Sequence, residues 1–116
     1  GYRVQGRETE MAEKMVADAL TLQQAGADLM LLECVPESLA ARITAVLDIP
    51  VIGIGAGPDC DGQILVLYDI LDISLGMRPR FSKNFMEASD SIEGAISHFV
   101  SAVKEKTFPA AEHAFS

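Results

Sequence analysis

The sequence has no tryptophan, only two cysteines and little positive charge. Nine Lys and Arg residues stand against 17 Asp and Glu residues, so the formal net charge is −8 over 116 residues. Because no basic surplus is available to neutralise phosphates, neither nucleic acid nor an anionic membrane is expected as a partner. Cys34 and Cys60 are too few and too irregularly spaced for a disulfide framework or a zinc site, which favours free structural thiols in a reducing compartment.

Long apolar runs are also missing. None approaches the roughly 20 residues that cross a bilayer, and the opening GYRVQGRETE resembles neither a signal peptide nor a transit peptide. The hydrophobic content of 49% is ordinary for one globular domain with a buried core. We therefore expect a cytoplasmic protein without a membrane span. The chain opens on Gly1 rather than Met, which indicates a tag remnant, a processed terminus or a piece of a longer protein.

The most informative stretch is ADLMLLECVP, residues 27–36. Its four consecutive large apolar residues, 29–32, predict a strand buried on both faces, as in a parallel sheet covered by helices. Glu33 then stands at the carboxyl end of that strand, the edge where α/β proteins meet their ligands. Glu33 is thus a candidate for chemistry, and the alternative is a rim carboxylate paired with a neighbouring Arg or Lys.

Apolar residues at helical spacing predict two helices around this strand. One covers about residues 9–25 and is ended by Gly26, and the other covers about 36–47 with Pro36 at its first helical position. A second β-branched run over residues 49–54 completes a right-handed βαβ unit.

The second half of the chain is less regular. The stretch QILVLY, residues 63–68, is ambiguous between a third strand and a helical turn, because residues 55–62 are too few for a usual parallel crossover. A last amphipathic helix is predicted over about residues 90–106. At the other end of the chain, residues 1–7 carry two glycines and two arginines, which predicts a mobile cationic loop or a frayed terminus.

The glycine cluster GIGAG, residues 53–57, resembles a phosphate cradle. The dinucleotide-binding pattern needs a glycine where Pro58 stands, and no Lys-Ser/Thr pair follows for a P-loop. The cluster therefore predicts only a tight turn that a ligand or another segment can approach closely. Asp59 and Asp61 do not begin a calcium loop, because its last ligand position falls on Ile70.

Three weaker candidates have plain structural alternatives. Cys34 beside Glu33 is a possible nucleophile, but neither histidine is placed near it by sequence, so a buried thiol is favoured. His98 and His113 are predicted to be surface histidines. The last candidate is an anion-binding patch, with a loop pinned by two phenylalanines as the alternative; the patch comprises Arg78, Arg80 and Lys83, and the phenylalanines are Phe81 and Phe85.

Six segments, taken together and in this order, resemble the ketopantoate hydroxymethyltransferase family. The most specific are LLECVP at 31–36 and IPVIGIGAG at 49–57 followed by DGQILV at 61–66. The others are GYRVQGR at 1–7, KNF at 83–85 and EHAF at 112–115.

This resemblance implies a (βα)8 TIM barrel of the phosphoenolpyruvate/pyruvate superfamily, a fold of about 250 residues. Residues 1–116 would be the carboxyl-terminal portion of that single domain and would supply its last three βα units. The sixth strand would be LMLLE, the seventh PVIGI and the eighth QILVLY. The start at Gly1 would then be an internal boundary.

The resemblance further implies an enzyme that transfers a hydroxymethyl group from 5,10-methylenetetrahydrofolate to 3-methyl-2-oxobutanoate. The product is 2-dehydropantoate, at the first step of pantothenate and coenzyme A biosynthesis. Glu33 corresponds to the base that takes the C3 proton, and Mg2+ stabilises the enolate as a Lewis acid. The metal ligands are expected outside this chain and its folate-contacting residues are unknown. The fragment alone is expected to be inactive, and the family forms homo-oligomers.

Two other functions remain open at this stage. One is a non-catalytic α/β binding module that holds a small anion or a partner protein on its glycine loop. The other is a different lyase of the same superfamily that acts on an oxaloacetate-like acid. The DGQILV and EHAF segments favour the transferase over the lyase, and a carboxylate at the strand mouth favours an enzyme over the binding module.

Overall fold

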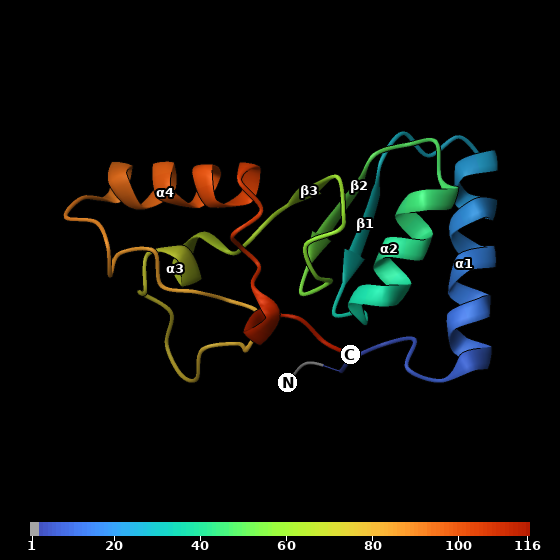
Figure 1. Cartoon of the computed structure of the whole chain (residues 1–116), viewed down its shortest axis with the longest axis horizontal. Coiled ribbons are helices and arrows are strands. Elements are labelled where there is room, and N and C mark those ends of the chain that lie inside the picture. Colours follow the sequence, from blue (N-terminus) through green and yellow to red (C-terminus); the bar gives the residue numbers. More distant parts are fainter. Residues whose placement is uncertain (1–2) are drawn as a thin grey trace.

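The computed structural model describes residues 3–116; Gly1 and Tyr2 lie outside the described residues. The described chain forms an α/β structure with a small parallel sheet, which confirms the predicted class (Figure 1). Its first half contains α1 (Thr9–Gln24), β1 (Met30–Glu33), α2 (Glu37–Val46) and β2 (Val51–Ile54). Its second half contains β3 (Gly62–Gln63), α3 (Leu67–Ile70), α4 (Ile92–Lys104) and a short 3-10 helix, η1 (Ala111–His113).

The sheet has the order β1-β2-β3, and both neighbouring pairs are parallel. In the register, Glu33 lies opposite Ile54, and Ile52 lies opposite Gly62. The ambiguous stretch 63–68 contains both of the structures considered for it, a strand and a helical turn. Only Gln63 continues a strand there, and after three more residues the chain enters α3.

A first hydrophobic cluster packs one face of the sheet against α1 and α2. Ile43 and Val51 are fully buried in it, and burying such a side chain stabilises the fold by about 1.5–3 kcal/mol. In β1, only Met30 and Leu32 point into this cluster.

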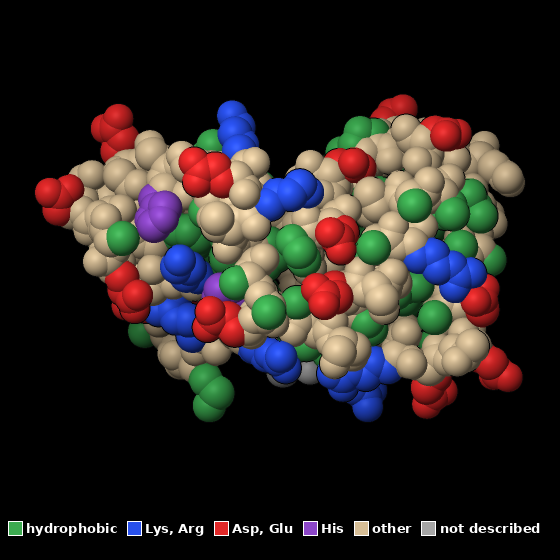
Figure 2. Space-filling view, in the orientation of Figure 1, with side chains coloured by type: hydrophobic (Ala, Val, Ile, Leu, Met, Phe, Trp, Pro, Cys, Tyr) green, Lys and Arg blue, Asp and Glu red, His purple; other side chains and the backbone are tan. Residues whose placement is uncertain are grey.

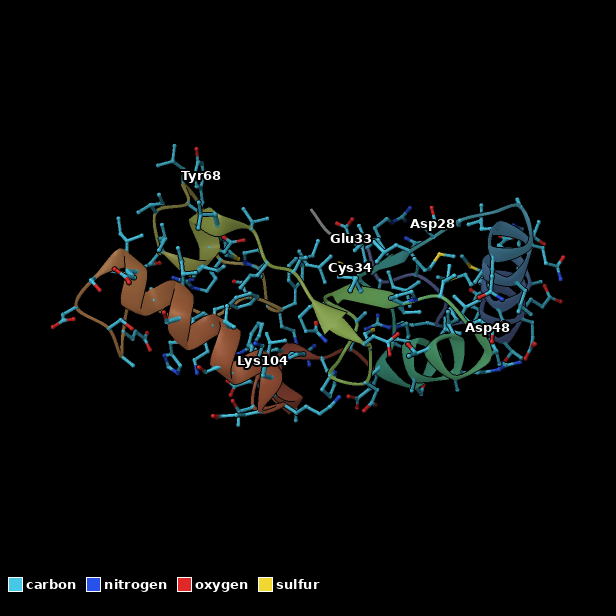
Figure 3. All side chains as sticks on the ribbon, turned by 90° about the horizontal axis from the view of Figure 1, so that it is seen from above. Asp28, Glu33, Cys34, Asp48, Tyr68 and Lys104 are labelled. Carbon is cyan, nitrogen blue, oxygen red and sulfur yellow. The ribbon has the colours of Figure 1, made fainter. Side chains whose placement is uncertain are left out.

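The prediction that β1 is buried on both faces is wrong for the described residues. Leu29 and Leu31 are 55% and 51% exposed, because successive side chains of a strand point to opposite faces and helices cover only one face here. Because the uncovered face of the strand also carries apolar side chains, the four residues show no alternation of apolar and polar types in the sequence. Figure 3 shows this uncovered side facing away from α2 and α4.

A second cluster lies in the α3–α4 part, beside the sheet in Figure 1. Phe85 is fully buried there against the rings of Phe99 and Phe108, at centroid distances of 5.5 and 5.2 Å. The helix α4 is shorter than predicted at both ends. Ser91 caps its start by accepting a hydrogen bond from Gly94 N, and Lys106 follows its end with a positive φ of 59°.

Two further local predictions have clear outcomes. The helix predicted over 9–25 is confirmed as α1, and Gly26 beyond its end has a φ of 106°. Pro36 is not the first helical residue, because its ψ of 139° is extended and α2 begins at Glu37. Among residues 3–116, no helix combines the length and the hydropathy that crossing a membrane would need.

Candidate active site

Glu33 is the last residue of β1, and its side chain is exposed on the uncovered side of the sheet. Leu32 before it and Cys34 after it are buried, so the alternation of the strand directs the carboxylate away from α1 and α2. Figure 3 shows Glu33 at the centre of the molecule, on the same side of the sheet as Tyr68. A ligand can therefore reach the carboxylate.

The Glu33 carboxylate has no partner within residues 3–116. The ion pairs of this region join Lys14 to Asp18, Arg42 to Glu13 and Arg78 to Asp72, and none involves Glu33. The alternative of a rim carboxylate paired with a neighbouring Arg or Lys is thus not what the structure contains. An exposed, unpaired carboxylate retains its lone pairs for a proton or a ligand.

Cys34 turns the chain directly after this carboxylate. Its φ is 52°, in the left-handed region that residues other than glycine rarely adopt. Cys34 N donates a hydrogen bond to Ile54 O at 3.0 Å, and Cys34 O accepts one from Gln5 N at 2.8 Å. These two backbone hydrogen bonds therefore hold Cys34, the residue after Glu33, in its left-handed conformation.

The Cys34 thiol does not have the properties of a nucleophile. It is buried, and burial raises its pKa, with a further increase from the nearby Glu33 carboxylate. Burial likewise raises the pKa of the Cys60 thiol, although a hydrogen bond with Thr44 lowers it in part. Both cysteines are free and buried, as predicted.

The glycine loop is filled by the protein itself. Gly55 and Gly57 have positive φ values of 66° and 79°. A Cβ on Gly55 would lie 3.0 Å from the Phe81 ring, and a Cβ on Gly57 would lie 2.4 Å from Glu37 Cβ. Because the loop is buried under these segments, it offers no cradle for an anion, and it does not support the binding-module alternative.

The cations of residues 78–83 do not form a shared anion site. Arg78 binds the Asp72 carboxylate and Asp69 O. Arg80 donates to Glu112 O, and Lys83 Nζ lies 5.3 Å from the Phe85 ring centroid. Phe81 and Phe85 are buried, so the alternative of a pinned loop describes this segment.

The amino-terminal segment is anchored where the structure describes it, contrary to the predicted mobile loop. Gln5 is bonded to Cys34, and Val4 packs on the cluster around Cys34. Gly6 is buried, and a Cβ there would lie 2.3 Å from Leu39. Arg7 Nε donates to Ser116 O at 3.3 Å, which joins this segment to the last residue.

The described residues do not form a metal site. Within residues 3–116, no group of three or more His, Cys, Asp or Glu side chains is arranged to hold an ion. Asp61 has a structural role instead, because its Oδ2 accepts a hydrogen bond from Val51 N at the start of β2. Asp69 is buried and accepts one from Ser74 Oγ.

The prediction of a surface histidine is wrong for His113. The residue is 8% exposed, and its Nδ1 accepts a hydrogen bond from Ala110 N at 3.0 Å. Phe108 lies beside it, with ring centroids 5.0 Å apart. His98 is half-buried against Phe85. The signal for a buried His113 was the flanking FP and AF pairs of the tail.

Acid is expected to weaken the fold through His113. Burial is the largest influence that lowers its pKa, Lys83 lowers it further and Glu112 opposes them, so the folded state favours the neutral ring. The neutral ring stabilises the fold above about pH 6.5, the pKa of an exposed histidine. This contribution is lost as pH falls below that value, because a protonated Nδ1 no longer accepts the hydrogen bond from Ala110 N. Melting temperatures from pH 7.5 to 5 should decline less steeply in His113→Gln than in the parent. Equal slopes would contradict this role.

Sequence reasoning missed the contribution of the last residues to the rim of the sheet. Phe115 packs in one cluster with Cys34, Ile54 and Phe81, which come from three other parts of the chain. A lone aromatic near the end of a tail has no periodic pattern that would reveal such a contact.

The parallel sheet, the helices on one face and the exposed carboxylate at a strand's carboxyl end form an arrangement of the kind in which α/β proteins bind their ligands. A sequence model of the family described as ketopantoate hydroxymethyltransferase matches residues 1–111. The chain therefore belongs to the ketopantoate hydroxymethyltransferase family.

Named relatives agree with this assignment. The 3-methyl-2-oxobutanoate hydroxymethyltransferase of Alkalilimnicola ehrlichii is 62% identical over 115 residues, which cover 99% of this chain and 42% of the relative. Proteins of the same name from Marinobacter nauticus and Pseudomonas fluorescens strain Pf0-1 are each 58% identical, with 99% and 100% of this chain and 44% of each relative covered. The chain spans less than half the length of these relatives.

Proposed function

We propose that this chain supplies the proton-accepting carboxylate of a 3-methyl-2-oxobutanoate hydroxymethyltransferase. The observation that carries the proposal is Glu33, an exposed carboxylate without a partner in residues 3–116, at the carboxyl end of a parallel strand. Its position on the sheet is the one where α/β enzymes place reacting groups. The proposed substrates are a branched 2-oxo acid, which the names of the relatives support, and 5,10-methylenetetrahydrofolate, which the family resemblance implies.

In the proposed reaction, a Glu33 oxygen accepts the proton that leaves C3 of 3-methyl-2-oxobutanoate. The electron pair of the C–H bond then forms the new C–C bond to the methylene carbon of the folate. Water supplies the hydroxyl oxygen as the two C–N bonds of the methylene carbon break. The proton from C3 and one proton of the water end on the two folate nitrogens, so tetrahydrofolate leaves with 2-dehydropantoate as the other product. Positioning is the main contribution of Glu33, since a carboxylate is a weak base for a C–H bond and acts on it only when held in contact.

Mg2+ belongs to this proposal as an expectation from the family resemblance. The described residues do not fit the ion, because within residues 3–116 Glu33 belongs to no group of three or more His, Cys, Asp or Glu side chains that could hold one. Its ligands would have to come from parts of the family's sequence beyond these 116 residues. For that reason the 116-residue polypeptide alone is expected to be inactive. The complete barrel, homo-oligomerisation and a cytoplasmic location likewise stay predictions.

The distribution of charge supports an anionic substrate at this edge. Figure 2 shows Lys and Arg side chains at the lower edge, where β1 and β2 point in Figure 1, and it shows both Lys or Arg and Asp or Glu side chains over the rest of the visible face. Arg7 and Arg80 are held near this edge by their bonds to the last residues. Cations at this edge favour an anionic substrate there.

The test is a chimera in which residues 1–116 replace the matching segment of the Alkalilimnicola ehrlichii relative. It should form 2-dehydropantoate only when 5,10-methylenetetrahydrofolate is present, and it should exchange the C3 proton of the oxo acid for deuterium without folate. The unmodified relative is the control. A chimera that sediments like the relative but catalyses neither step would overturn the proposal.

A further inference from the structure

The last seven residues, Ala110–Ser116, form a closing segment at the carboxyl end of β1 (red in Figure 1). Phe115 O accepts a hydrogen bond from Glu37 N at 2.9 Å. This bond satisfies the first amide of α2, which has no partner inside the helix. The closing segment is thereby joined to the helix that follows the Glu33 strand.

The Phe115 side chain is a packed part of this rim. It is 8% exposed and lies in the hydrophobic cluster of Cys34, Ile54 and Phe81. On its outer side, Arg80 Cζ lies 5.4 Å from the ring centroid. Arg80 is itself held by Glu112 O, at 3.3 Å from its Nε. The ring is therefore enclosed on both sides.

Cys34 connects this cluster to Glu33. A left-handed conformation at a residue other than glycine persists only where its surroundings impose it. Here the imposed contacts are the two backbone hydrogen bonds of Cys34 and the packing of its thiol. The peptide joining Glu33 to Cys34 sets the direction in which the carboxylate leaves the strand, so a loosened Cys34 would release Glu33 as well.

We propose that Phe115 is a positioning residue, which holds Cys34 in its left-handed conformation and thereby fixes the Glu33 carboxylate at the rim. This inference rests on the proposed function of Glu33. Phe115 lies beyond residues 1–111, the stretch matched by the family model. Its effect is transmitted through Cys34, and it has no contact with the reacting atoms.

The first test asks whether Phe115 holds Cys34 in place, and it needs no assay of activity. In the chimera, alkylation of native Cys34 and Cys60 by iodoacetamide is followed peptide by peptide. Phe115→Ala should increase the alkylation rate of Cys34 severalfold and leave that of Cys60 unchanged, because Cys60 packs in the separate α1–α2 cluster. Phe85→Ala, in the α4 cluster, is the matched control and should not increase the alkylation rate of Cys34 relative to that of Cys60.

The second test measures the step from Cys34 to Glu33. Phe115→Ala should lower kcat for C3 deuterium exchange by about 10²-fold, the cost of a misplaced catalytic group, with KM nearly unchanged. Phe115→Leu, which keeps an apolar side chain of similar reach, should recover most of the loss even if Phe115→Ala folds poorly. Phe85→Ala should lower the melting temperature without this fall in kcat per folded molecule.

The two tests separate the possible failures. Unchanged alkylation of Cys34 in Phe115→Ala and Phe115→Leu overturns the positioning role, whatever the activity. Increased alkylation with an unchanged kcat overturns it too, because Glu33 would then not depend on Cys34. A chimera without any exchange refutes the proposed function instead, and the alkylation rates still decide whether Phe115 holds Cys34.

Discussion

Replacing Glu33 by glutamine is expected to slow hydroxymethyl transfer severely while leaving the binding of the 2-oxo acid nearly intact. The amide keeps the shape of the side chain and removes its ability to accept the C3 proton, so the loss should appear in kcat. General-base contributions are typically about 10²–10⁴-fold, and a loss of that size is expected here. Deuterium exchange at C3, followed by NMR without folate in the chimera, isolates this step from the transfer.

Asp28→Asn is the matched control for Glu33→Gln. Asp28 is an exposed carboxylate next to the opposite end of the same uncovered row, and Figure 3 shows both residues. Its replacement removes the same charge from the same side of the sheet and should leave exchange unchanged. Exchange at the parent's rate in Glu33→Gln would eliminate Glu33 as the base.

Gly57→Ala is expected to destabilise the fold by about 2–5 kcal/mol. Positive φ costs a residue with a Cβ about 1–2 kcal/mol, and overpacking adds about 1–3 kcal/mol. The overpacking is specific here, because the new Cβ would lie 2.4 Å from Glu37 Cβ and 3.1 Å from Glu37 Cα, which is backbone that cannot rotate away. Melting temperatures of the chimera and its variants measure the effect.

Gly26→Ala separates the two contributions. Gly26 has an equally unfavourable φ of 106°, but a Cβ there would meet nothing within 4 Å. Gly26→Ala should therefore lose only the conformational part, about 1–2 kcal/mol. If both variants lower the melting temperature equally, the close packing of the glycine loop on α2 contributes nothing to stability.

The sequence predicts those features of the fold that depend on neighbours along the chain. The periodicity of residues 9–25, the apolar run before Glu33 and the second run at 49–54 each determine one element, and all three form where expected. The short connection over residues 55–62 had left open whether 63–68 forms a strand, and only the two residues 62–63 pair with β2.

Features that depend on distant partners were not predictable in this way. Leu29 and Leu31 read as buried because the sequence does not say how many faces of the sheet the present residues cover. Phe115 is buried by segments that are remote in sequence. At the candidate site, the carboxylate was predictable from its strand end, whereas its lack of a partner and the residues that hold it required coordinates.

The closing segment also has a consequence for the order of events during synthesis. The β1 strand and its carboxylate are translated before Phe115, which packs in one cluster with Cys34. At about 5–20 residues per second, several seconds separate the two. A nascent chain can therefore build the α1–α2 layer before the surroundings of Glu33 are complete, and under the proposed role of Phe115 the Glu33 carboxylate acquires its final direction only after Phe115 has been made.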